Sequence, residues 1–227
     1  MRLKPTPPVF ATRIIKKVSK ISKRLKYEVI EMRDVDFDTL IILGDGDVDD
    51  VVIPIICHHL DGTKIVGITK PERTRISILK DFPIYISSKI CKIALIMDRE
   101  DDTVNNIYEQ AEKSLQDLNI KFELAKDEDQ MRKYNCRFGN KIFDFILIIS
   151  GLDEIPADKH RIEDHLIKAA INLGKIEQPN KKIDTKEAWK ALDKKSIKDE
   201  ILSKLKESKS FSYEIFRQHF RGLELLK

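Results

Sequence analysis

The chain has 227 residues and a net charge of only +4, and its 41% hydrophobic content is enough for a substantial core. Its three cysteines show no paired spacing, which excludes a zinc ribbon or a disulfide framework and favours a reducing, cytoplasmic location. Every apolar run is shorter than the roughly 18 residues that a membrane span needs, so we expect a soluble protein with no membrane partner.

The first part of the chain is expected to be an extended leader followed by a basic helix. Residues 1–10 contain three prolines, which disfavour regular structure. From residue 12 to residue 26, Ile14, Val18, Ile21 and Leu25 recur at helical spacing. Lysines and arginines occupy positions between them, and residues 13–26 contain no acidic side chain. The pattern predicts an amphipathic basic helix.

Short apolar runs then alternate with helical patterns. The apolar runs predict strands at residues 39–43, 64–69, 93–97, 121–125 and 143–149. Helices are predicted at residues 49–60, 72–80, 102–118 and 161–172. This alternation is typical of an α/β protein in which helices flank a mainly parallel sheet. We expect strands 39–43 and 93–97 to be parallel neighbours.

The pattern changes after residue 174. Helices are predicted at residues 187–192, 197–207 and 213–226, and no strand signal remains. We therefore expect three parts, namely a basic N-terminal extension (1–37), an α/β core (38–178) and a C-terminal helical appendage (179–227). The appendage should pack beside the core without extending its sheet.

Acidic side chains follow the predicted strands. Asp45 and Asp49 come after the first strand of the core, Asp98 and Glu100 come after strand 93–97, and Glu163 opens the helix at 161–172. Ligands of parallel sheets gather at the carboxyl ends of the strands, and oxygen-only clusters suit Mg²⁺ or Mn²⁺. The alternative is that these acids only favour the N-termini of the helices that follow. Asp47 and Asp50 are expected to be solvated.

Three segments resemble motifs of the Toprim family. Residues 41–52 (IILGDGDVDDVV) resemble its first motif, an apolar strand followed by Glu-Gly-x-x-Asp, with Asp45 in the place of Glu. Residues 93–101 (IALIMDRED) are similar to its Asp-x-Asp motif, with Asp98 first and Glu100 replacing the second Asp. Residues 145–167 look like the late strand and helix start of small Toprim-like proteins related to OLD-family nucleases. The resemblance covers residues 38–172.

The resemblance implies a Toprim-like fold and Mg²⁺-dependent phosphodiester chemistry on nucleic acid, namely a nuclease. Asp98 and Glu100 would hold the metal, Asp49 and Glu163 would assist, and Asp45 would take the place of the general acid or base. A shorter side chain at Asp45 favours an alternative, a non-catalytic nucleic-acid-binding protein that keeps the fold. A third possibility is a phosphoryl-transfer regulator or assembly factor that docks through the C-terminal helices.

The basic helix is the candidate contact for nucleic acid. Its cations include Lys16, Lys17, Lys20, Lys23 and Arg24, which would bind the phosphates of DNA or RNA. The competing interpretation is an ordinary amphipathic helix that packs through its apolar stripe.

Overall fold

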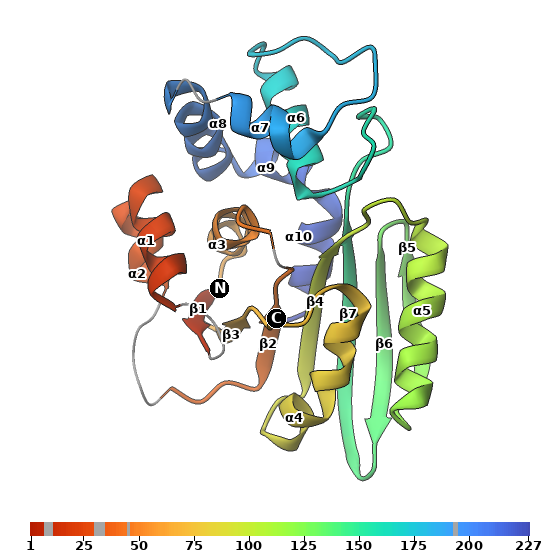
Figure 1. The fold of residues 1–227 in the computed structure, drawn as a ribbon. Coiled ribbons are helices and arrows are strands. Elements are labelled where there is room, and N and C mark those ends of the chain that lie inside the picture. The colour runs from red at the N-terminus through yellow and green to blue at the C-terminus, as the bar shows by residue number, and fades with distance from the viewer. Residues whose placement is uncertain (7–10, 30–34, 45, 193–194) are drawn as a thin grey trace.

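The computed structural model describes residues 1–6, 11–29, 35–44, 46–192 and 195–227. A seven-stranded sheet with the strand order β1-β3-β2-β4-β7-β6-β5 forms its centre (Figure 1). The strands are β1 (Arg2–Pro5), β2 (Thr39–Ile42), β3 (Ile65–Thr69), β4 (Lys92–Asp98), β5 (Lys121–Glu128), β6 (Met131–Phe138) and β7 (Lys141–Ser150).

The sheet has a parallel part and an antiparallel part. Strands β1, β3, β2, β4 and β7 run parallel, and β7, β6 and β5 form an antiparallel meander. The expected α/β fold with a mainly parallel sheet is therefore confirmed. Strands β2 and β4 are parallel neighbours, as predicted, with Ile41 opposite Ala94.

Helices cover both faces of the sheet. They are α1 (Ala11–Ile21), α2 (Lys23–Glu28), α3 (Asp49–His59), the 3₁₀ helix η1 (Arg75–Asp81), α4 (Phe82–Ser87), α5 (Val104–Asp117), α6 (Ile162–Asn172), α7 (Thr185–Ala191), α8 (Lys195–Glu207), α9 (Lys209–Ile215) and α10 (Arg217–Glu224). Helices η1, α4 and α5 cover one face, and α1, α3, α6 and the C-terminal helices cover the other.

Alternation of side chains along the central strands separates two hydrophobic cores. Ile41 and Leu43 belong to the core beneath α3 and α6, whereas Leu40 and Ile42 belong to the core beneath η1 and α5. Because a central strand is buried on both faces, it needs apolar residues at every position. This explains why the sequence of β2 is a continuous apolar run, and the same reasoning applies to the centre of β4.

Both ends of the chain are more closely integrated than the sequence suggests. The leader is extended at Arg2–Pro5, but it is also a sheet strand that pairs with β3, and Leu3 is buried. The predicted basic helix is divided into α1 and α2 at Ser22. The residues described after 178 form helices and no strand, as predicted. Ile201 and Phe220 share one core with Ile146 of β7.

Candidate acidic site at the carboxyl ends of the strands

The structure brings four of the predicted acidic residues into one region. Burial raises the pKa of Asp98 well above its usual value, and the negative charges of Asp49, Glu163 and Glu100 raise it further. Asp98 ends β4, Asp49 begins α3, and Glu163 lies in the first turn of α6. Asp45 lies outside the described residues, so its predicted role has no structural counterpart here.

The position of Asp98 is determined by two neighbouring elements. Its strand pairs with β7, and Asp98 lies opposite Ser150. Its Oδ1 accepts a hydrogen bond of 2.8 Å from the backbone N–H of Ile162, the first residue of α6. A helix N-terminus offers unpaired N–H groups and partial positive charge. This bond favours the ionised carboxylate and opposes the effects of burial and of the neighbouring acids.

Asp49 lies against the loop that joins β2 to α3. Its side chain is buried, and a Cβ atom built on Gly46 would lie only 2.7 Å from its Oδ2. Any other residue at position 46 would therefore displace the carboxylate. Glycine in the segment LGDG has a packing role here, because it lets the backbone approach Asp49 closely.

Glu163 and Glu100 have different surroundings. Glu163 is 3% exposed, and burial raises the pKa of its carboxyl. Glu100 has a left-handed backbone with φ of 59°. Its two carboxylate oxygens accept hydrogen bonds of 2.9 and 3.2 Å from the Arg161 guanidinium. A bidentate pair of this kind is strong and directional, so the Glu100 carboxylate is already engaged within the protein.

Two lysines hold the loop before α3. Asp50 is only 1% exposed and pairs with Lys17 at 3.0 Å and with Lys70 at 3.1 Å. Lys17 and Lys70 also donate hydrogen bonds to the carbonyl oxygens of Asp47 and Gly46. The expectation that Asp50 is solvated is therefore wrong, because a carboxylate buried this deeply is stabilised by paired cations. The side chain of Asp47 is exposed, as expected.

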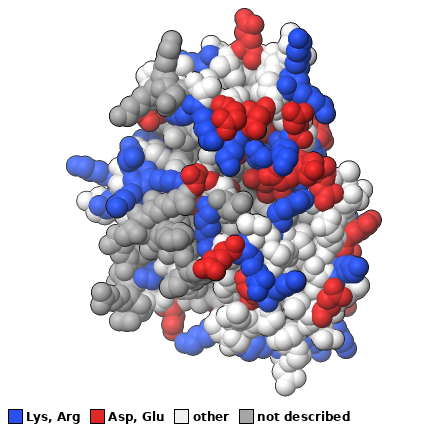
Figure 2. All heavy atoms as spheres, viewed as in Figure 1, with Lys and Arg blue, Asp and Glu red and all other residues white. Residues whose placement is uncertain are grey.

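The basic helix is partly structural. Ile14 and Val18 of α1 and Leu25 of α2 are buried in the core. Lys17 binds the loop before α3 through the Asp47 carbonyl and Asp50. Lys16, Lys20, Lys23 and Arg24 are exposed. Figure 2 shows blue side chains over α1 and α2 at the left of the molecule, apart from the acidic surface near the upper ends of β5 and α5. The packing and surface interpretations of this segment therefore apply to different side chains.

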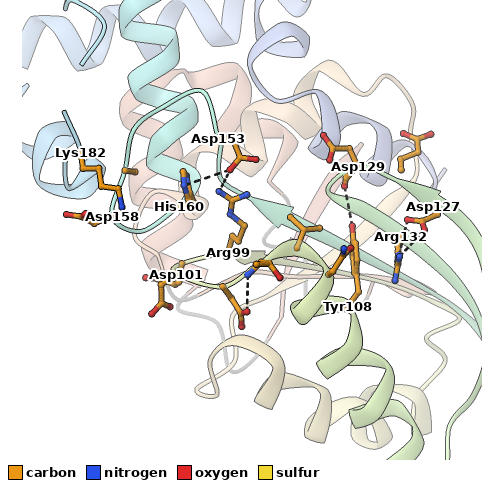
Figure 3. A pocket seen from close by; sticks show the side chains of 17 residues that line it. Arg99, Asp101, Tyr108, Asp127, Asp129, Arg132, Asp153, Asp158, His160 and Lys182 are labelled. Carbon is orange, nitrogen blue, oxygen red and sulfur yellow. Dashed lines mark hydrogen bonds and ion pairs between the residues drawn. The ribbon is translucent and has the colours of Figure 1, made fainter. Parts of the chain in front are cut away.

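A polar pocket of about 850 Å³ lies beside the acidic cluster (Figure 3). Its lining includes Arg99 and Glu100, which directly follow Asp98, and the start of α5. Carboxylates outnumber cations among the lining residues, so the pocket would repel a bare phosphate. Arg99 is 6% exposed, and its guanidinium pairs with Asp153.

A buried histidine pair joins the C-terminal helices to β7. Ser150 Oγ lies 2.9 Å from His219 Nε2, and the rings of His219 and His165 are 5.1 Å apart. Burial lowers the pKa of His165 to about 4. Burial, followed by the neighbouring His165, lowers the pKa of His219 well below its usual value. Both imidazoles are therefore neutral at pH 7. Through His219, helix α10 contacts Ser150, the residue that lies opposite Asp98 in the sheet.

The sequence interpretation missed several charged residues of this region. Lys70 directly follows β3, and this position at a strand end is a signal that the sequence contained. Arg161 and Arg99 offered no comparable signal, because their partners Glu100 and Asp153 lie 61 and 54 residues away. Only the tertiary structure identifies these pairs.

A complete metal site is not present among the described side chains. Within the described residues, which exclude Asp45, no group of three or more His, Cys, Asp or Glu side chains has an arrangement that could hold a metal ion. The donor set of Asp49, Asp98 and Glu163 nevertheless has the chemistry that a hard cation prefers. In chemical terms the site is a buried acidic cluster that lies beside a lysine-clamped loop.

Comparison of the chain with family models, with curated proteins and with solved structures finds no match. In the part of the chain that the structure describes, none of the helices has both the length and the apolar composition needed to cross a membrane. The fold and the site define an α/β protein with acidic residues at the carboxyl edge of its sheet.

Proposed function

We propose that this chain is a Toprim-like nuclease that hydrolyses phosphodiester bonds of nucleic acid with the help of Mg²⁺. The observation that carries the proposal is the buried cluster around Asp98, in which Asp49, Glu163 and Glu100 raise its pKa. Clustered carboxylates repel one another unless protons or a cation neutralise them. Perturbed carboxyl groups in one region are also typical of functional sites.

Each acidic residue has a distinct role in the proposal. Asp98 would hold Mg²⁺ or Mn²⁺, and Asp49 and Glu163 would assist after moving closer together than they lie in the described structure. Asp45 would act as the general acid or base. The bound cation would supply charge stabilisation to the phosphate and lower the pKa of a water. Glu100, which the resemblance places among the ligands, would first have to leave Arg161, so we assign it a supporting position.

The exposed cations of α1 and α2 would bind the phosphates of the substrate. Lys16, Lys20, Lys23 and Arg24 are exposed. Lys17 connects α1 to Asp50, the neighbour of Asp49 in α3. A nucleic acid held on the α1 part of this basic surface would therefore lie beside the acidic cluster, whose own negative charge cannot attract a phosphate chain.

A second candidate function is a non-catalytic nucleic-acid-binding protein that keeps the fold. The bidentate pair between Glu100 and Arg161 favours it, because that pair occupies a carboxylate of the Asp-x-Asp-like motif. In this alternative the basic surface binds nucleic acid and the acidic cluster performs no turnover.

A cleavage assay separates the two candidates. Labelled single- and double-stranded DNA and RNA are incubated with the protein in Mg²⁺, in Mn²⁺ and in chelator. The nuclease proposal predicts metal-dependent cleavage that Asp98→Asn abolishes and that Asp101→Asn retains, because Asp101 is an exposed carboxylate three positions further along the chain. Binding without cleavage in either metal would reject the nuclease and support the alternative.

A further inference from the structure

An exposed aromatic side chain lies within the basic surface. Tyr27 in α2 is 78% exposed, more than Ile84 at 67% or Ile142 at 66%. An aromatic ring left in water is an unfavourable arrangement for its apolar faces. A single exposed ring is common on proteins, so its meaning depends on the neighbouring side chains.

Two cations lie on the same face of the helix as Tyr27. Lys23 and Arg24 precede it by four and three residues, so all three side chains lie on the same face of α2. Leu25 is buried and marks the opposite, inward face of the helix. Lys23 and Arg24 are both exposed. The solvent face of α2 thus combines an aromatic ring with two positive charges.

This face is continuous with the rest of the basic surface. Helix α2 follows α1 after the single residue Ser22, and the two helices pack together. Lys16 and Lys20 are exposed on α1 one helical turn apart. Helix α1 is in turn held beside the acidic cluster by the ion pair between Lys17 and Asp50. Tyr27 lies at the other end of this surface, because its neighbour Glu28 pairs with His58 in the last turn of α3. The cationic surface therefore extends along α3, from Tyr27 to the loop beside the candidate site.

We propose that the surface of Tyr27, Lys23 and Arg24 binds single-stranded nucleic acid, with an unpaired base stacked on the Tyr27 ring. Lys23 and Arg24 contact the phosphates on either side of that base. Aromatic rings within cationic surfaces are the usual means of holding single strands, because every unpaired base offers a flat face. In a duplex the bases are already stacked, so the ring gains nothing from them. The inference rests on the proposed function and specifies its substrate class.

Charge decides between nucleic acid and an apolar protein partner. An apolar partner would have to desolvate Lys23 and Arg24 together with the ring, and unpaired charges are costly to bury. Arg24 forms an ion pair with Glu28, at 3.8 Å on the helix surface. A polyanion with flat rings satisfies both kinds of side chain at once.

The test measures binding by the full chain in chelator, so that cleavage does not interfere. The probes are a fluorescently labelled oligothymidylate, a DNA duplex of the same length and the RNA counterparts of both. The variants are Tyr27→Ala, Tyr27→Phe and the control Ile84→Ala, which removes another exposed apolar side chain, in α4. Loss of one stacked base should weaken single-strand binding about 5- to 150-fold in Tyr27→Ala. Tyr27→Phe, Ile84→Ala and all duplex affinities should stay near those of the wild type.

The outcomes distinguish this inference from the proposed function. If Tyr27→Ala binds both probes as tightly as the wild type, or weakens both equally, the stacking role is wrong. The nuclease proposal then survives, provided that metal-dependent cleavage still depends on Asp98. If the wild type binds neither probe nor any RNA counterpart, both the surface inference and the proposed function are rejected.

Discussion

Replacement of Asp98 by Asn should stabilise the protein in chelator. The substitution keeps the shape of the side chain and leaves an oxygen that can accept the hydrogen bond from Ile162. It removes a negative charge that burial and three neighbouring carboxylates disfavour. Relief of that repulsion favours folding. Asp98→Asn should therefore be more stable than the wild type in chelator, whereas most substitutions of buried residues are destabilising.

The size of the effect follows from the raised pKa of Asp98. Each unit by which folding raises a carboxyl pKa corresponds to about 1.4 kcal/mol of folding free energy lost when the group is ionised. For a domain of this size, one such unit changes Tm by about 3–6 °C. The pKa is raised above the usual 3.8, so wild-type stability in chelator should fall as pH rises above this value. In Asp98→Asn, the stability in chelator should depend less steeply on pH.

Addition of Mg²⁺ should reverse the order of the two proteins. A ligand at a hundred times its Kd stabilises the folded state by about 2.7 kcal/mol, and the wild type should gain this while Asp98→Asn gains much less. The assay is thermal unfolding of both proteins and of the control Asp101→Asn, with chelator and with Mg²⁺. Equal stabilisation of wild type and Asp98→Asn by Mg²⁺ would refute the metal-site reasoning, and a less stable Asp98→Asn in chelator would refute the repulsion argument.

Three further predictions concern the C-terminal helices and can be checked by urea unfolding. Gly222→Ala should lower the free energy of unfolding by up to about 2 kcal/mol, because the new Cβ would lie 2.5 Å from Ile148 Cδ1. Overpacking here outweighs the better helix propensity of alanine, and a more stable variant would contradict this. Ile201→Ala should lose about 2–5 kcal/mol from its fully buried site, and a loss below that range would indicate a loosely packed helix. Stability should fall below pH 6.5, by about 1.4 kcal/mol per pH unit for each of His165 and His219, because the unfolded chain takes up protons that the buried rings do not. His219→Gln should reduce this dependence, and an unchanged pH profile would exclude a contribution from His219.

The elements that the sequence predicts well are those whose local pattern matches their environment. The central strands β2, β4 and β7 are buried on both faces, so their apolar runs are long enough to be recognised. Strand β6 was missed because it alternates buried Tyr134 and Cys136 with polar residues in a sequence, MRKYNCRF, that is rich in charge. Strand β1 was missed as a sheet strand because its pairing partner β3 lies about sixty residues away.

The candidate site shows the same division. Acidic residues at strand ends were visible in the sequence, and the parallel arrangement of β2 and β4 follows from their neighbouring helices. The pairing of these acids with cations was not predictable. Lys70 is visible in the sequence at a strand end, but Lys70 and Arg161 meet Asp50 and Glu100 only in the folded chain. The sequence therefore identifies the acidic residues of the cluster, whereas their charged partners are defined only by long-range contacts.

The shared core of the central strands and the last helices has a consequence for biosynthesis. Ile148 in β7 packs closely against Gly222 in α10 and shares one core with Leu223, and the ribosome adds these two residues about 75 residues later. At the usual rate of about 5–20 residues per second, this interval lasts about 4–15 s. During that time an apolar sheet face stays uncovered on the nascent chain and is open to chaperones. Slower translation lengthens this period, so rare codons after β7 should increase aggregation during expression.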